Sequence, residues 1–246
     1  MYRSLLATLL LGLFPATQDM NTDGMTLENM AIAPPSSELL LEDRLSASGV
    51  VIFNRESGQL LFTKEHKIQR PMASLTKLMT SYVIFKRLKE GFITLDEEVK
   101  ISEKAWKTGG SRSFIEVGKM IKLEDLLKGM IIQSGNDASV ALAEHVAGSE
   151  GTFVLFMNDY AEQIGMKNSN FENSSGLPHD NQYSTAKDMA ILSSAMIRDF
   201  PDYYKWYSEK EFTYNNITQP NRNKLLSRDS TVDELKLAGL KKRDIV

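Results

Sequence analysis

Cysteine is absent from the 246 residues of this chain. Its absence excludes disulfide bonds, thiolate metal sites and a cysteine nucleophile. Histidine is scarce as well, and its three copies, His66, His145 and His179, are scattered along the chain. A two-histidine metal site and a Ser-His-Asp triad are therefore not expected. We predict a protein without a metal or an organic cofactor, in which any serine nucleophile needs a base other than histidine.

A large excess of one charge is also missing. The formal net charge is −3, with 29 lysines and arginines against 32 aspartates and glutamates. Such a balance gives no reason to expect a nucleic-acid partner. The chain is 42% hydrophobic, and its length suits a globular protein of one or two domains with a sizeable core.

The N-terminus has the pattern of an export signal. Arg3 precedes a short apolar run over residues 5–14, and a polar stretch follows Pro15. The run is too short to span a bilayer, so it predicts a signal peptide over residues 1–17, with an undetermined cleavage site. A buried N-terminal helix is the alternative. We interpret residues 18–35, which contain Pro34-Pro35, as a linker before a domain over residues 36–246.

Hydrophobic periodicity places most of the secondary structure. Two strands joined by a turn are followed by a long helical block and then by one more strand. The expected strands cover residues 48–53, 59–63 and 211–216, and the expected helices cover 74–89, 123–133, 138–147, 153–165 and 185–198. This order predicts an α+β fold with an antiparallel sheet and a large helical insertion.

The first chemical signal is Ser74-Leu75-Thr76-Lys77. Residues three apart on a helix share a face, so the lysine amine can reach the serine hydroxyl. A partly desolvated lysine near other cations can be neutral and act as the base. Ser74 also lies near the predicted helix N-terminus, where free N–H groups help to stabilise an oxyanion.

A second Ser-x-x-Lys match, Ser184-Thr185-Ala186-Lys187, shows how unspecific this spacing is by itself. We interpret it as an ordinary helix start with Ser184 or Thr185 as the N-cap.

The second chemical signal is Ser134-Gly135-Asn136, sixty residues after Ser74, in a tight turn between two apolar helices. A loop there can project a hydroxyl and a carboxamide into a cleft. Ser134 can then relay a proton to a leaving amine, and Asn136 can hold a substrate amide. The alternative is a simple Ser-Gly-Asn turn without chemistry.

Both motifs and their flanking residues resemble the low-molecular-mass penicillin-binding proteins, which are serine-type D-alanyl-D-alanine carboxypeptidases with Ser-x-x-Lys, Ser-x-Asn and Lys-Thr-Gly motifs. The resemblance runs from about residue 35 to residue 233 and includes residues 173–177 and 221–226. It implies a penicillin-binding/β-lactamase-like transpeptidase fold, in which an antiparallel sheet accompanies a large helical subdomain.

The resemblance also implies a reaction and its partners. Ser74 would attack the peptide carbonyl of a peptidoglycan pentapeptide stem, and Lys77 would take the serine proton. Ser134 would protonate the departing D-alanine, and Asn136 would bind substrate. β-Lactam antibiotics would acylate the same serine. The protein would act outside the cytoplasm, in the periplasm or on the outer face of the membrane.

The third motif departs from the family pattern. Lys236 is in place to bind the substrate carboxylate, but Leu237 replaces the threonine, and Gly239 comes one position late. One possible choice of codons for residues 232–246 can be read in another frame. When a single base is inserted after its Asp233 codon, the new reading begins Val-Asp-Gly-Ile-Lys-Thr-Gly. We therefore expect a frameshifted tail; a natural variant and a chance C-terminus are the rival explanations.

On this hypothesis, the catalytic domain over residues 36–246 is incomplete from about residue 234. It would lack the C-terminal strands, and the family's C-terminal β domain and membrane anchor would be absent. We expect a poorly stable chain with little or no carboxypeptidase activity. The alternatives are an inactive remnant, a non-catalytic penicillin-binding module and a class A β-lactamase. The last would need a glutamate before Leu177, and Glu172, the nearest, lacks that class's pattern.

Overall fold

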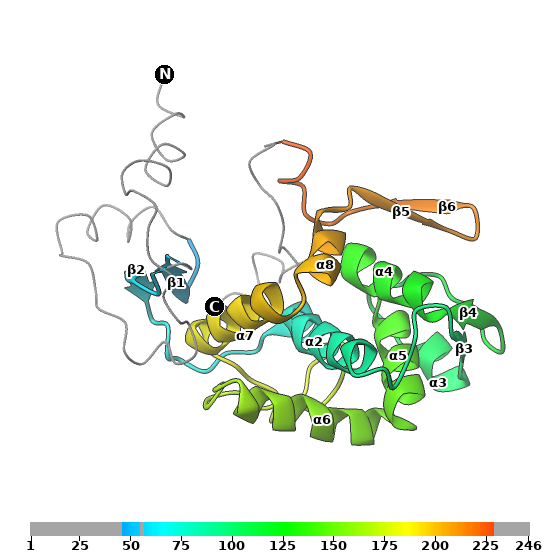
Figure 1. The fold of residues 1–246 in the computed structure, drawn as a ribbon, viewed down its shortest axis with the longest axis horizontal. Helices are drawn as coiled ribbons and strands as arrows, with labels where there is room; N and C mark the ends of the chain where they lie inside the picture. The colour runs from blue at the N-terminus through cyan, green and yellow to red at the C-terminus, as the bar shows by residue number, and fades with distance from the viewer. Residues whose placement is uncertain (1–45, 55–56, 229–246) are drawn as a thin grey trace.

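The computed structural model describes residues 46–54 and 57–228. Within them, a body of helices carries three separate two-stranded antiparallel sheets (Figure 1). The strands are β1 (Val50–Phe53), β2 (Leu60–Lys64), β3 (Glu98–Lys100), β4 (Met120–Lys122), β5 (Glu211–Tyr214) and β6 (Ile217–Pro220). The helices are α2 (Thr76–Lys89), α3 (Glu103–Lys107), α4 (Leu123–Gln133), α5 (Asn136–Ala147), α6 (Glu150–Gln163), α7 (Ala186–Asp199) and α8 (Pro201–Tyr204). The predicted α+β fold is confirmed.

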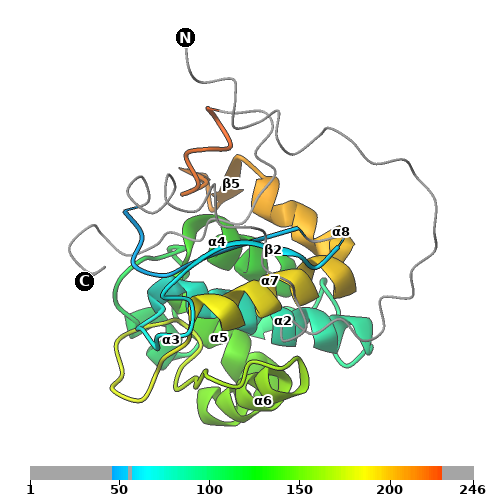
Figure 2. The same cartoon turned by 90° about the vertical axis from the view of Figure 1, so that its left-hand side faces the viewer.

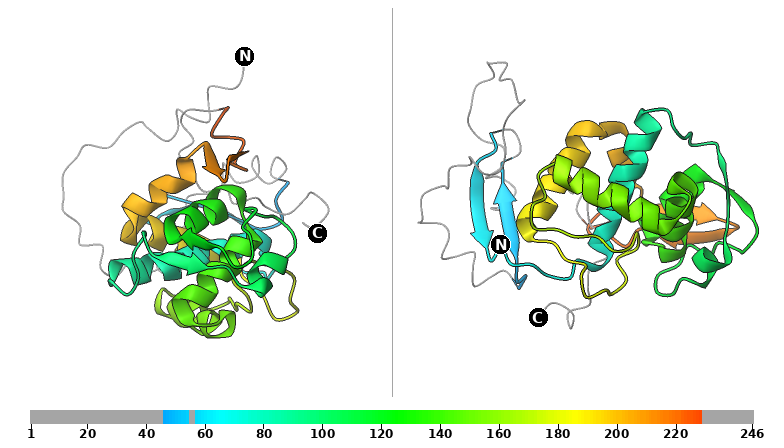
Figure 3. Two further views of the ribbon diagram at one scale, coloured as in Figure 1. Left: turned by 90° about the vertical axis from the view of Figure 1, so that its right-hand side faces the viewer. Right: turned by 90° about the horizontal axis from the view of Figure 1, so that it is seen from below.

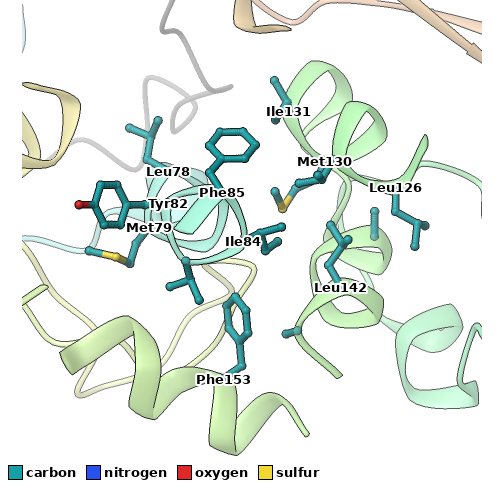
Figure 4. Close-up of a cluster of buried hydrophobic side chains, with 14 of the residues drawn as sticks. Leu78, Met79, Tyr82, Ile84, Phe85, Leu126, Met130, Ile131, Leu142 and Phe153 are labelled. Atoms are coloured by element: carbon teal, nitrogen blue, oxygen red, sulfur yellow. The ribbon is translucent and has the colours of Figure 1, made fainter. Parts of the chain in front are cut away.

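Helix α2 is the central element, and its first ten residues, 76–85, are all buried. A helix that is enclosed on every side must be covered by several neighbours. Figure 4 shows these neighbours: Met130 of α4, Leu142 of α5 and Phe153 of α6 all point toward the apolar side chains of α2. The polar groups at the start of α2 are therefore buried and need partners inside the protein.

The β1–β2 and β5–β6 hairpins pack against different helices. Strand β1 packs against α7. The right-hand view of Figure 3 shows the β1–β2 hairpin beside this helix. The β5–β6 hairpin packs against α4 instead. Its two turn residues, Asn215 and Asn216, both have positive φ values, 49° and 58°, as a two-residue hairpin turn requires. Figure 2 shows α7 between β2 and α2.

Several boundaries differ from the sequence prediction. Helix α6 starts three residues before the predicted Phe153, because Ser149 caps it by accepting a hydrogen bond from the Thr152 amide at 3.1 Å. Helix α5 begins at Asn136, inside the motif that we expected to be a turn. None of the described helices has both the length and the apolar character needed to cross a bilayer.

Candidate active site

Ser74 sits in a short 3₁₀ helix, Ala73–Leu75, which leads directly into α2. The preceding residue, Ala73, has a φ of 44°, a left-handed conformation that is strained for a residue with a Cβ atom. Its carbonyl group lies against Gly176, where an added Cβ atom would come within 1.9 Å of the Ala73 oxygen. Gly176 itself has a φ of 84°. The segment that carries Ser74 is therefore fixed by a backbone contact that only glycine permits.

Lys77 follows one helical turn later and is completely buried. Its Nζ atom lies 3.3 Å from Ser74 Oγ, 2.7 Å from Asn136 Oδ1 and 2.5 Å from the Ser175 carbonyl oxygen. The pKa of Lys77 is lowered to about 7, mainly by burial and also by the positive charge of Arg222, against the opposing effect of Asp137. A large fraction of this amine is thus neutral near pH 7 and can accept a proton from Ser74.

Ser134 occupies the junction between α4 and α5. It has left-handed backbone angles, φ 60° and ψ 39°, and ends α4 as its C-cap residue. The side chain is buried, and its hydroxyl has no hydrogen-bond partner among the described residues. A buried and unpartnered hydroxyl in a strained turn is typical of a functional position.

The Asn136 carboxamide joins the lysine to the loop that precedes β4. Its oxygen accepts from Lys77, and its Nδ2 group donates to the Gly109 carbonyl at 2.7 Å. Gly110, with a φ of 87°, passes so close that an added Cβ atom would lie 2.5 Å from Asn136 Nδ2. The backbone of Asn136 also donates to the Ser111 carbonyl at 2.8 Å. The loop and the start of α5 therefore form one hydrogen-bonded unit.

Two charged residues hold this unit in place. Arg222 donates to Ser111 Oγ at 2.7 Å. The buried Asp137 carboxylate accepts from the Ser113 amide at 2.9 and 3.1 Å and from the Ala138 amide at 2.9 Å. Burial raises the pKa of Asp137, although these backbone donors counteract the effect.

The structure brings together four of the five predicted site residues. Hydrogen bonds join Ser74, Lys77 and Asn136, and Ser134 lies two residues before Asn136 at the α4–α5 junction. The fifth, Lys236, lies outside the described residues together with the rest of the altered third motif. Ser175 could not be predicted as a site residue, because it contributes a backbone carbonyl, which leaves no side-chain signature. Residues 173–177 and 221–226, which contain Ser175 and Arg222, contribute to the sequence prediction only through the family resemblance.

The second Ser-x-x-Lys match is a helix start, as predicted. Thr185 caps α7 by accepting from the Asp188 amide at 3.0 Å, and Ser184 Oγ lies 2.7 Å from Ser169 Oγ. Glu172, the nearest glutamate to a β-lactamase pattern, accepts from the Asn170 side chain at 2.9 Å.

Known proteins resemble this chain over most of its length. A family model described as peptidase S11, D-alanyl-D-alanine carboxypeptidase, matches residues 36–241. The D-alanyl-D-alanine carboxypeptidases DacA of Haemophilus influenzae and DacC of Escherichia coli are 44% and 43% identical over 197 and 199 residues. Each match covers 78% of this chain and 50% of the relative. The chain thus spans about half the length of these relatives.

Solved structures give the same result. Penicillin-binding protein 5 of Haemophilus influenzae aligns with a TM-score of 0.74 at 43% identity, over 81% of this chain and 57% of that one. The D-alanyl-D-alanine carboxypeptidase DacD of Francisella tularensis aligns with a TM-score of 0.76 at 31% identity, over 80% and 60%.

Proposed function

Because the chain belongs to the peptidase S11 family of D-alanyl-D-alanine carboxypeptidases, we propose that its site serves to cleave the terminal D-alanine from peptidoglycan pentapeptides through an acyl-enzyme on Ser74, with turnover limited by the altered third motif around Leu237. The observation that carries this proposal is the buried amine of Lys77. It lies within hydrogen-bond reach of Ser74 Oγ, and its pKa of about 7 allows it to serve as a base.

In the proposed reaction, Lys77 takes the proton from Ser74 Oγ as that oxygen attacks the carbonyl carbon of the D-Ala-D-Ala bond. The bond to the terminal residue then breaks, and Ser134 passes a proton to the leaving amine. Asn136 holds the substrate amide. Water then hydrolyses the ester and frees Ser74. Penicillins, which mimic the D-Ala-D-Ala end, would acylate Ser74 in the same way.

The remaining expectations about the chain stay predictions. They are the export signal over residues 1–17, the linker over 18–35, the catalytic domain over 36–246, and a role for Lys236 in binding the substrate carboxylate. Action outside the cytoplasm belongs with them, because it depends on the export signal.

The test is covalent labelling with a fluorescent penicillin, followed by an assay for D-alanine release from a pentapeptide. We expect labelling of the intact protein and its loss in Ser74→Ala. Ser184→Ala is the matched control, because it alters the serine of the other Ser-x-x-Lys match and should keep the label. A folded protein that takes up no penicillin would contradict the proposal.

A further inference from the structure

A short segment, residues 173–176, contacts Lys77 and other residues at the start of α2. The Ser175 carbonyl accepts from Lys77 Nζ at 2.5 Å, and the Ser174 carbonyl accepts from Thr80 Oγ1 at 2.6 Å. Two consecutive carbonyl groups thus face two buried donors of α2. The position of this segment therefore determines where the amine of Lys77 lies.

Glu150, the first residue of α6, holds the segment from the other side. Its Oε1 atom accepts both from the Ser174 amide at 3.1 Å and from Ser174 Oγ at 2.8 Å. Its Oε2 atom pairs with Lys104 Nζ at 2.7 Å. Burial would raise the pKa of Glu150, but the hydrogen bonds from Lys104 and Ser174 lower it overall, so the carboxylate stays ionised near neutral pH.

These contacts form a continuous path from an acidic side chain at the start of α6 to the base of the proposed reaction. Ser174 is fully buried and is held by Glu150 and Thr80 together. Without Glu150, the Ser174 amide and hydroxyl would lose their acceptor, and a buried unpaired donor is costly. The segment would then shift toward water and withdraw the Ser175 carbonyl from Lys77.

We propose that Glu150 is a positioning residue for Lys77, and that it acts through Ser174 by fixing the Ser175 carbonyl against the lysine amine. The inference rests on the proposed function for its meaning, because Lys77 is the base only in that reaction. The contacts themselves do not depend on the reaction, so the positioning role is measurable without substrate.

The test is a ¹³C NMR titration of the lysine Cε signals, with Lys77 assigned by its loss in Lys77→Arg. Glu150→Ala removes the acceptor, whereas Glu150→Gln keeps an oxygen that can accept from Ser174. Glu144→Ala is the matched control: Glu144 also accepts from a serine hydroxyl, Ser102 Oγ at 2.6 Å, whereas the acceptor of Ser174 is Glu150. Lys104→Met removes the ion pair and leaves the bonds to Ser174 in place.

In Glu150→Ala, we expect the titration midpoint of Lys77 to rise by about one pH unit, a tenfold change in proton affinity. The rise follows because water that reaches the amine relieves the burial that lowers its pKa. Glu150→Gln, Glu144→Ala and Lys104→Met should titrate like the unmodified protein. Coincident midpoints in Glu150→Ala and the unmodified protein would overturn the proposal.

Two further measurements keep the test decisive. If Glu150→Ala does not fold, Ser174→Ala decides, because it removes only the hydroxyl bond to Glu150. It should raise the Lys77 midpoint by a smaller amount, and an unchanged midpoint would refute the proposal. Penicillin labelling of the unmodified protein tests the reaction separately. A shifted midpoint without labelling would leave the positioning role standing and reject the proposed function alone.

Discussion

Lys77 is an unusual lysine because its neighbours are neutral acceptors rather than a carboxylate at hydrogen-bond distance. Its amine touches a hydroxyl, a carboxamide and a carbonyl oxygen. Burial disfavours the charged form, and Arg222 disfavours it further. An amine in this setting remains a base at the pH at which an ordinary lysine is protonated.

The rate of penicillin acylation should therefore depend on pH through Lys77. Below a pH of about 7, the rate constant should rise about tenfold per pH unit, and above it the rate should level off, because only the neutral amine accepts the serine proton. Stopped-flow measurement of acylation between pH 5 and pH 9 checks this. A rate that keeps rising to pH 9 would show that the amine has an ordinary pKa.

The same shift predicts a pH-dependent stability. The folded pKa is about 7 and the unfolded value 10.5, so the unfolded state binds more protons between them. The free energy of unfolding should then rise with pH in this window, by roughly 1 kcal/mol per pH unit from this group. Urea unfolding at several pH values measures the slope, which Lys77→Met should lack. Equal slopes in both proteins would contradict the assignment.

At the residue scale, the sequence predicts which side chains meet but not what surrounds them. Helical spacing is sufficient to place Lys77 beside Ser74, and the Ser-Gly-Asn motif predicts that Asn136 joins them. Ser175 was beyond prediction because it contributes a main-chain carbonyl, and any residue type supplies one.

At the scale of elements, the contact between the Ser74 segment and residues 173–176 depends on the absence of a Cβ atom at Gly176. Gly176 lies so close to the Ala73 carbonyl that no Cβ atom fits, and its positive φ also favours glycine. The start of α2 and the 173–176 segment thus constrain each other. Helix α2 alone would not fix the direction of the serine.

Gly176→Ala should therefore lower penicillin acylation by about tenfold or more, because it displaces the Ser74 segment. Gly165→Ala is the matched control. Gly165 has a similar φ of 90° but nothing within 4 Å of an added Cβ atom, so it bears only the backbone strain, about 1 kcal/mol. Acylation rates and urea unfolding of both variants separate the two effects. Equal acylation in the two variants would refute the steric argument.

Periodicity predicted the longer elements and missed the short ones. Helix α4 has the predicted bounds, 123–133, because its apolar stripe extends over three turns. Strands β3 and β4 have three residues each, which is too short for an alternating pattern to be recognised. They pair across residues 101–119, which include α3, and a local pattern does not report such a long-range contact.

For the whole molecule, the core rather than the sheets holds the described structure together. The largest buried cluster joins α2 to α4, α5 and α6, whereas each sheet has only two strands. Two-stranded sheets are marginal by themselves and depend on packing against helices. Stability should respond most strongly to changes around α2.

Phe153→Ala should lower the free energy of unfolding by about 3–5 kcal/mol, because it leaves a cavity where α6 meets α2. Leu155→Ala is the control on the same helix. Leu155 is 67% exposed, and its loss should change stability by less than about 0.5 kcal/mol. Urea unfolding monitored by circular dichroism measures both. A similar cost for both variants would show that the α2–α6 contact contributes little.

The left-handed backbone of Ser134 also affects which residue is retained at this position during evolution. With its φ of 60°, the position favours glycine over any residue with a Cβ atom, by roughly 1–2 kcal/mol. Selection for folding alone would therefore favour replacing Ser134 with glycine, whereas the role in proton transfer that we propose for its hydroxyl would oppose that replacement. A lineage that no longer needs catalysis would lose this serine early. Its free energy of unfolding would rise as its activity fell, so a measurement of stability would not reveal the loss.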